Sequence, residues 1–288
     1  DFCLSRGLGD VYKRQEYFST LVQQDDSIPL FEAALAIAQD AEPNLDLAAS
    51  QAEVDTLAVK LKQRLPEDAS TLQKLRMLNH YFYNELGFSG NVNDYYNPDN
   101  SYLHRVIDTR RGIPISLAVL YMELAQQIDL DVQGISFPGH FLMKLAVQSG
   151  QVVLDPFNGA SLSREELEER VEPYIMQQDF PDDFQLTAYL DAASPRDILV
   201  RMLRNLKTLF MQQERWQRLL EVQERLLILL PHEIAERRDR GIAYMHLECP
   251  QAALLDLEAY VKHRPYAMDT AELRAQFAKL RDDISRLN

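Results

Sequence analysis

The feature that most constrains this fold is a helical segment, residues 114–128, that is apolar on nearly every side. Its apolar residues are Leu117, Leu120, Tyr121, Leu124 and Ile128. A helix of this kind has to be buried on several sides. Apolar residues then recur with period two in residues 132–137, 140–147 and 151–154, and Ser149-Gly150 provides a turn between the last two. The pattern predicts a buried central helix followed by an antiparallel meander.

The residues before this helix are predicted to be helical. Apolar residues recur at helical spacing over residues 28–41, 45–65 and 71–86, and Gly87 is well placed to cap the third helix. Residues 91–101 read Asn-Val-Asn-Asp-Tyr-Tyr-Asn-Pro-Asp-Asn-Ser, and side chains of these types favour turns by bonding their own backbone. The spacing of the acidic residues departs from that of a calcium loop. We therefore expect a loop without a metal.

The C-terminal part carries an internal repeat. Residues 198–231 and 232–265 are equal in length, and each segment ends in proline and contains two amphipathic helices. The matched positions are Leu209 with Ala243, Phe210 with Tyr244, and Leu220 with Leu254. This pattern resembles tetratricopeptide repeats, whose units are about 34 residues long and bury their apolar faces against their neighbours. Residues 270–287 are expected to form a capping helix, and the boundary with the preceding domain is expected at residues 192–195.

Composition excludes several classes of function. The chain of 288 residues has a formal net charge of −14 and no segregated basic patch, so nucleic acid is not an expected partner. Its apolar runs are shorter than the roughly 20 residues that cross a bilayer. The two cysteines, Cys3 and Cys249, make no disulfide framework, which favours a cytoplasmic protein. The histidines lack metal-ligand spacing and no glycine-rich phosphate loop is present, so no metal or cofactor is expected.

Three residues stand in the order of a nucleophile, a base and an acid. Ser116 lies at the start of the apolar helix, where unpaired N–H groups and the helix dipole favour negative charge. The dipole supplies at most about 2 kcal/mol, too little to ionise an alcohol. Ser116 would therefore need His140 as a general base and Asp155 to hold the imidazole tautomer. The alternative is a helix-capping or packing role for Ser116.

The arrangement of His140 and Asp155 depends on the hairpin register. A hairpin closed at Ser149-Gly150 would place Asp155 opposite Lys144, so direct pairing of Asp155 with His140 would need an irregular or bulged loop. A structural role for both residues is the alternative.

Several linked motifs resemble the SirB-one/YchA family. They are Gly90-Asn91, Asp94-Tyr95-Tyr96, Asn100-Ser101-Tyr102-Leu103, Arg111-Gly112-Ile113-Pro114-Ile115-Ser116-Leu117, Pro138-Gly139-His140-Phe141 and Asp155-Pro156-Phe157-Asn158-Gly159. The resemblance implies a papain-like or transglutaminase-like α+β core, with a helical N-terminal region and a central helix on an antiparallel sheet. An all-α tetratricopeptide-like domain would follow. In the wider superfamily the triad is Cys-His-Asp, and Ser116, or alternatively Ile115, stands where the cysteine is expected.

The domain boundaries follow from these observations. Residues 1–15 look like a translated sequencing adapter and are excluded from the fold prediction. Residues 16–193 are expected to form the helical region and the core, and residues 194–288 the repeats.

The missing cysteine favours a non-catalytic protein that binds a protein or peptide through its core cleft and the groove of its repeats. We expect the binding residues to be Arg110, Arg111, Asp94, Tyr95 and Tyr96. The alternative is a hydrolase or acyltransferase on a peptide or amide substrate that uses a degenerate triad of Ser116, His140 and Asp155.

Overall fold

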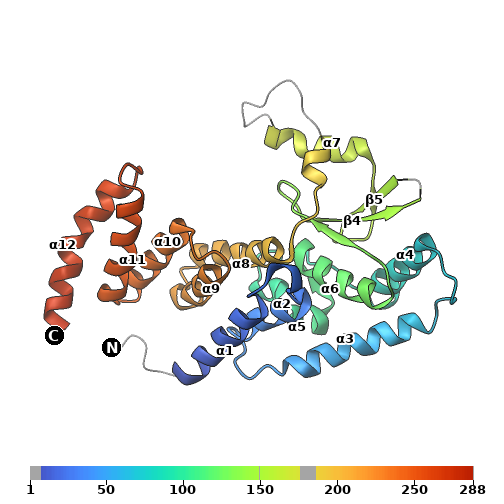
Figure 1. Ribbon diagram of the computed structural model, residues 1–288, viewed down its shortest axis with the longest axis horizontal. Helices are drawn as coiled ribbons and strands as arrows, with labels where there is room; N and C mark the ends of the chain where they lie inside the picture. Colours follow the sequence, from blue (N-terminus) through green and yellow to red (C-terminus); the bar gives the residue numbers. More distant parts are fainter. Residues whose placement is uncertain (1–7, 149, 176–185, 288) are drawn as a thin grey trace. The chain divides into compact units, whose positions relative to one another are not determined.

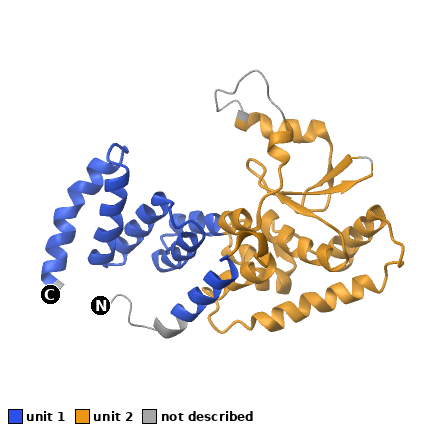
Figure 2. Ribbon diagram, viewed as in Figure 1, with its two compact units in different colours: residues 1–23, 203–288 blue, residues 24–202 orange. Residues whose placement is uncertain are grey.

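A computed structural model describes residues 8–148, 150–175 and 186–287 of the chain (Figure 1). The described residues cluster into two compact units (Figure 2). The first unit, called here the core unit, is Gln24–Met202. The second, called the repeat unit, contains the described residues up to Gln23 and those from Leu203 onward.

The core unit is built around helix α6, Pro114–Gln127, in which 11 of 14 residues are buried. Its other helices are α2 (Leu30–Ala38), α3 (Leu47–Lys62), α4 (Thr71–Asn79), α5 (Leu103–Thr109) and α7 (Arg164–Ile175). Short helical turns lie at Asp25–Ser27, Pro98–Ser101 and Leu186–Leu190, and a π-helix at His80–Glu85 continues α4. Helix α6 packs against α2, α3 and α5 and also against two strands of a sheet. The predicted burial of this helix on several sides is what the structure shows.

The sheet that α6 contacts has four antiparallel strands in the order β3-β4-β5-β6. The strands are β3 (Gln133–Ile135), β4 (Leu142–Val147), β5 (Gly150–Leu154) and β6 (Ser161–Leu162). A separate parallel pair joins β1 (Ser89–Gly90) to β2 (Arg111–Gly112). The pair places the segment before the 91–101 loop beside the segment that leads into α6. The sequence pattern predicted β3, β4 and β5 but neither β6 nor this short pair, because two-residue strands carry no periodicity.

The hairpin register differs from the sequence expectation. Val147 pairs with Gly150 and Lys144 pairs with Val153, which is a shift of two residues from the register that a turn at Ser149-Gly150 implies. Ser149 itself lies outside the described residues. The ladder runs from Met143 to Val147 without a bulge. The expected pairing of Asp155 with Lys144 is therefore wrong.

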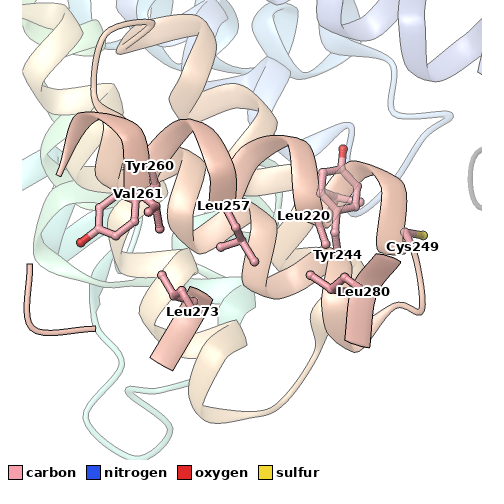
Figure 3. Close-up of a cluster of buried hydrophobic side chains, with 9 residues drawn as sticks. Leu220, Tyr244, Cys249, Leu257, Tyr260, Val261, Leu273 and Leu280 are labelled. Carbon is pink, nitrogen blue, oxygen red and sulfur yellow. The ribbon is translucent and has the colours of Figure 1, made fainter. Parts of the chain in front are cut away.

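The repeat unit contains paired helices with the predicted period. Its helices are α1 (Leu8–Leu21), α9 (Trp216–Leu229), α10 (Ile234–His246), α11 (Pro250–His263) and α12 (Thr270–Leu287), together with the C-terminal part of α8 (Pro195–Gln212). Helices α9 and α11 have the same length, and both ends of α11 follow those of α9 by one full period. Gly241 allows α10 to approach α11 closely, since a Cβ there would lie 2.8 Å from Leu257 Cγ. Buried side chains from α9 to α12 form one core, which includes Leu220, Tyr244, Leu257, Tyr260 and Leu280 (Figure 3).

Helix α1 belongs to the repeat unit, whereas the residues from 16 onward were expected in the core domain. Phe18 is fully buried, and the guanidinium of Arg225 on α9 lies 4.6 Å from the centre of its ring. Only part of α1 falls within residues 1–15, and the adapter interpretation of that segment stays a prediction.

Two features of the chain bear on its expected cellular location: its lack of long apolar segments and its cysteines. Among the described residues, no helix is both long enough and apolar enough to span a membrane. Cys249 is buried, while Cys3 lies outside the described residues. The cytoplasmic location expected from the sequence stays a prediction.

Candidate functional site

His140 and Asp155 lie together at the end of the β4-β5 hairpin. His140 is in a turn before β4, where its N–H donates to the carbonyl of Phe137 at 3.2 Å, and Asp155 directly follows β5. His140 Nε2 is 2.9 Å from Asp155 Oδ1. No bulge is needed for this contact, because both residues lie beyond the paired ladder and the imidazole spans the remaining distance.

The Asp155 carboxylate is held by three groups. Besides His140, the N–H of Phe157 donates to Oδ1 at 3.0 Å, and Arg170 on α7 donates to Oδ2 at 3.0 Å. Burial alone would raise the pKa of Asp155, but hydrogen bonds from His140, Phe157 and Arg170 together hold that pKa below its ordinary value. Asp155 is therefore an ionised group that orients the imidazole, and Arg170 offsets part of the charge that would stabilise a protonated histidine.

The turn that carries His140 is fixed by Arg201 from α8. Arg201 donates to the carbonyl of Phe137 at 3.1 Å and to that of His140 at 2.8 Å. Gly139 has a φ of 66°, and a Cβ there would overlap the hydroxyl of Tyr174, so the turn requires glycine. Arg201 also interacts electrostatically with Tyr95 and Tyr174. Aromatic side chains from a loop and from α7 thus gather near the backbone of His140.

Ser116 is fully buried, and its hydroxyl both donates and accepts hydrogen bonds. The oxygen lies 2.6 Å from the carbonyl of Asn100 and 3.0 Å from that of Ile113, and it accepts the N–H of Ile113 at 3.1 Å. Ile113 is the N-cap and Pro114 the first helical residue, so Ser116 is third in the helix. A side chain in that position often accepts a hydrogen bond from the N–H of the N-cap residue, which is half of a capping box. None of these hydrogen bonds involves His140 or Asp155.

Asn100 connects Ser116 to the 91–101 loop. Its side chain donates to the carbonyls of Asp94 at 2.6 Å and Tyr95 at 3.1 Å, and it accepts from Asn91 at 2.9 Å. Its own carbonyl accepts the hydroxyl of Ser116. Asn100 is only 3% exposed. The loop is therefore folded around one buried amide, which is itself joined to the start of α6.

The loop presents two of the predicted binding residues to solvent. Tyr95 and Tyr96 are 42% and 69% exposed, and their rings meet edge to face with centroids 5.4 Å apart. The ring of Tyr95 also lies 6.5 Å from that of Phe157, two residues after Asp155. Asp94 accepts a hydrogen bond from Asn97 at 2.8 Å within the loop. The loop thus brings its aromatic side chains beside the segment that carries Asp155.

Arg110 and Arg111 contact other parts of the core unit. Arg110 has a φ of 58° and caps α5, while its guanidinium pairs with Glu53 at 3.3 Å and lies 4.7 Å from the Phe88 ring centre. Arg111 donates to the carbonyl of Gly87 at 2.8 Å. These contacts stabilise the junction between α5 and α6.

Metal-ligating side chains do not cluster in the part of the chain that the structure describes. No group of three or more His, Cys, Asp or Glu side chains there has the arrangement of a metal centre.

Sequence reasoning missed three residues that shape this site: Asn100, Arg170 and Arg201. Arg170 and Arg201 come from helices that follow the strands, 15 residues after Asp155 and 61 residues after His140. No spacing rule links an arginine to a backbone carbonyl so far along the chain. For Asn100, the signal was the asparagine-rich loop itself, since buried asparagines commonly hold loop carbonyls.

Two family models match the chain on either side of residue 205. Residues 48–204 match the transglutaminase-like superfamily, and residues 206–278 match the tetratricopeptide repeat. The chain belongs to the transglutaminase-like superfamily and carries tetratricopeptide repeats after the core. The α+β core followed by an all-α repeat region, expected from the sequence, is thereby confirmed.

Individual relatives agree with the narrower resemblance. The chain is 39% identical to a UPF0162 protein of Xylella fastidiosa over 90% of this chain and 92% of that protein. It is 29% identical to Protein SirB1 of Salmonella typhimurium and 27% identical to the UPF0162 protein YchA of Escherichia coli, each over 78% of this chain and 82% of the relative. The resemblance to the SirB-one/YchA family is confirmed. No solved structure matches the chain.

Proposed function

We propose that this chain is a non-catalytic, regulatory transglutaminase-like protein that binds a protein or peptide through its core and its repeats. The observation that carries the proposal is the burial of Ser116, whose hydroxyl is committed to the backbone of Ile113 and Asn100. A nucleophilic serine has to reach both its base and the substrate. In this chain the serine instead stabilises the junction between α6 and the loop that presents Tyr95 and Tyr96.

The binding half of the proposal rests on the exposed aromatic surface near His140. Tyr95, Tyr96 and Tyr174 are each at least 42% exposed. Tyrosine is enriched at protein interfaces because it buries a large area with few rotatable bonds and keeps a polar tip. His140 is a quarter exposed, and its Nε2 already bonds to Asp155, so Nδ1 remains to contact a ligand. An extended peptide with hydrogen-bonding groups fits this combination.

The repeat unit supplies the second docking surface of the proposal. Tetratricopeptide repeats indicate protein–protein interaction, since stacked helix pairs form extended concave surfaces. A cytoplasmic location is also part of the proposal, and fractionation of cells that express the tagged chain tests it.

A Ser-His-Asp hydrolase or acyltransferase is the second candidate. It is favoured by the 2.9 Å contact between His140 and Asp155, in which the carboxylate holds one imidazole nitrogen as a triad acid does. The same contact serves equally well to shape a binding surface.

A fluorophosphonate probe distinguishes the two candidates. The full chain is expected to show no labelling of Ser116 after incubation at neutral pH, measured by mass spectrometry of the peptide that contains this residue. A known serine hydrolase in the same tube serves as the positive control. Labelling of Ser116 that disappears in His140→Ala would establish the hydrolase and refute the non-catalytic proposal.

The binding surface is tested with a double variant, Tyr95→Ala with Tyr96→Ala. Protein partners captured from a bacterial extract by the wild-type chain are expected to be depleted about tenfold or more, because aromatic anchors dominate interface energies. Val59→Ala with Leu72→Ala is the matched control, since both are exposed apolar residues of the core unit, on α3 and α4, outside the 91–101 loop and the repeat unit. Equal capture by the wild-type chain and the double variant would remove the loop from the proposed surface.

A further inference from the structure

The core unit contains a large pocket that the proposed function does not use. It has a volume of about 980 Å³ and is lined by parts of α2, α3, α6 and β3 and by Ala192, Ala193, Pro195 and Ile198. Neither His140, Asp155, Tyr95 nor Tyr96 is among its lining residues. This volume lies at the upper end of the range, about 300–1,000 Å³, of pockets that enclose a ligand. The pocket can therefore take several side chains at once.

The floor of the pocket is apolar. Buried side chains from four segments contribute to it: Phe31 on α2, Val119 and Met122 on α6, Val132 just before β3, and Ile198 at the start of α8. An apolar floor favours a ligand with hydrocarbon parts.

All charged residues that line the pocket are acidic. Four carboxylates line it, those of Glu32, Glu123, Asp129 and Asp131, and no lysine, arginine or histidine of the described chain is among the lining residues. Lys74 contacts the lining residue Asp129 from outside the pocket: its ammonium donates to the backbone carbonyls of Ile128 at 2.8 Å and Asp129 at 3.3 Å. An anionic ligand would be repelled and a cationic one attracted.

Two of these carboxylates are bonded to amides and not to cations. Glu123 accepts from Gln127 at 2.8 Å and from Gln51 at 3.4 Å, and Asp131 accepts from Gln133 at 3.2 Å. A neutral amide leaves the negative charge of a carboxylate in place. An arriving ammonium or guanidinium group therefore meets two carboxylates, those of Glu123 and Asp131, whose charge no ion pair within the described residues has offset.

One backbone group on the sheet edge beside the pocket is already bonded. Strand β3 is the first strand of the sheet, and the carbonyl of Gly134 accepts the N–H of Ala193 at 2.8 Å. Residues 192–193 therefore occupy this position of the edge, where an added strand would bond.

We propose that this pocket binds a peptide segment of a partner protein in which lysine or arginine alternates with bulky apolar residues. Lysine and arginine have long hydrocarbon stems that lie on apolar surface while their charged heads remain at the rim. The apolar floor and the carboxylate rim of the pocket match the two parts of such side chains. The site is additional to the proposed binding surface near His140.

The test uses the full chain and three fluorescein-labelled peptides, measured by fluorescence anisotropy. The first peptide alternates lysine with leucine, the second glutamate with leucine, and the third lysine with serine. The lysine–leucine peptide is expected to bind, the glutamate–leucine peptide not to bind, and the lysine–serine peptide to bind about tenfold more weakly because it lacks apolar contacts. Equal binding of both lysine peptides would overturn the proposal, since general charge attraction would then explain it.

Variants of the chain locate the binding. Glu123→Gln with Asp131→Asn is expected to weaken binding of the lysine–leucine peptide about tenfold, because both substitutions keep shape and remove charge. Glu67→Gln with Asp68→Asn removes the same charge at exposed positions that do not line the pocket and should leave binding unchanged. Equal weakening by both pairs, or by neither, would overturn the proposal. Circular dichroism of each variant shows that it is folded, and Tyr95→Ala with Tyr96→Ala should bind this peptide normally.

Discussion

Asn100→Ala is expected to lower the free energy of unfolding of the core unit by about 3 kcal/mol, because the side chain makes three hydrogen bonds of about 1 kcal/mol each. The bonds go to the carbonyls of Asp94 and Tyr95 and come from the amide of Asn91. For a unit of this size, the loss corresponds to a fall of roughly 6–12 °C in the melting temperature. Differential scanning calorimetry of the full chain measures it.

The same substitution has a functional readout. Without Asn100 the loop loses the amide around which it folds, so capture of partners through Tyr95 and Tyr96 should fall even below the melting temperature. Asn97→Ala is the matched control: Asn97 lies in the same loop, accepts the N–H of Asp99 at 2.9 Å as a cap and donates to the exposed carboxylate of Asp94 at 2.8 Å. Water can replace the exposed bond, so the variant should cost about 1 kcal/mol. Equal destabilisation by the two variants would mean that Asn100 is not the centre of the loop.

Asp256→Ala is expected to destabilise the repeat unit by about 3–5 kcal/mol, the usual cost of leaving one member of a buried ion pair alone. Asp256 on α11 is 3% exposed and receives two hydrogen bonds from the guanidinium of Arg240 on α10, at 2.6 Å and 2.9 Å. Burial alone would lower the pKa of Arg240, and the contact with Asp256 raises it above its ordinary value. The variant would leave this guanidinium without its carboxylate, and chemical denaturation followed by circular dichroism reports the loss.

Two further variants separate this pair from a general charge effect. Glu258→Ala removes a carboxylate from the same helix, but Glu258 and its partner Arg281 are both largely exposed, so the cost should stay below about 1 kcal/mol. Replacing both members, as in Asp256→Ala with Arg240→Met, should recover part of the stability because no buried charge is then left alone. A double variant as unstable as the sum of its single variants would contradict this explanation.

The fold was largely predictable because its signals are local or periodic. Helices α9 and α11 are displaced by the same period at both ends, and a repeat that buries its apolar face only against its neighbour has to show this period in the sequence. Helix α6 was predictable for a related reason, since apolar residues on all sides require burial on all sides. The two-residue strands and the register of the β4-β5 hairpin were not predictable, because a shift of two residues leaves the same side chains on the same face.

The candidate site was predictable in its residue types and not in its contacts. The resemblance to a Cys-His-Asp family indicated that His140 and Asp155 belong together, and the structure places their side chains 2.9 Å apart. The sequence placed Ser116 at the start of a helix but left a nucleophile and a cap as alternatives. Its burial and its contact with Asn100 appear only once the 91–101 loop is folded against α6.

By itself, the sequence determined the class of this protein: a transglutaminase-like core with a buried helix, a C-terminal region of regular helical repeats, and a serine where a thiol is expected. Periodicity and residue identity are properties of the sequence itself, so they can be recognised without the tertiary structure. Only the tertiary structure decided what the serine hydroxyl bonds to, which arginines hold His140 and Asp155, and where an acidic pocket forms. Each of these depends on groups from distant segments meeting at hydrogen-bond distance, and no local pattern encodes such a meeting.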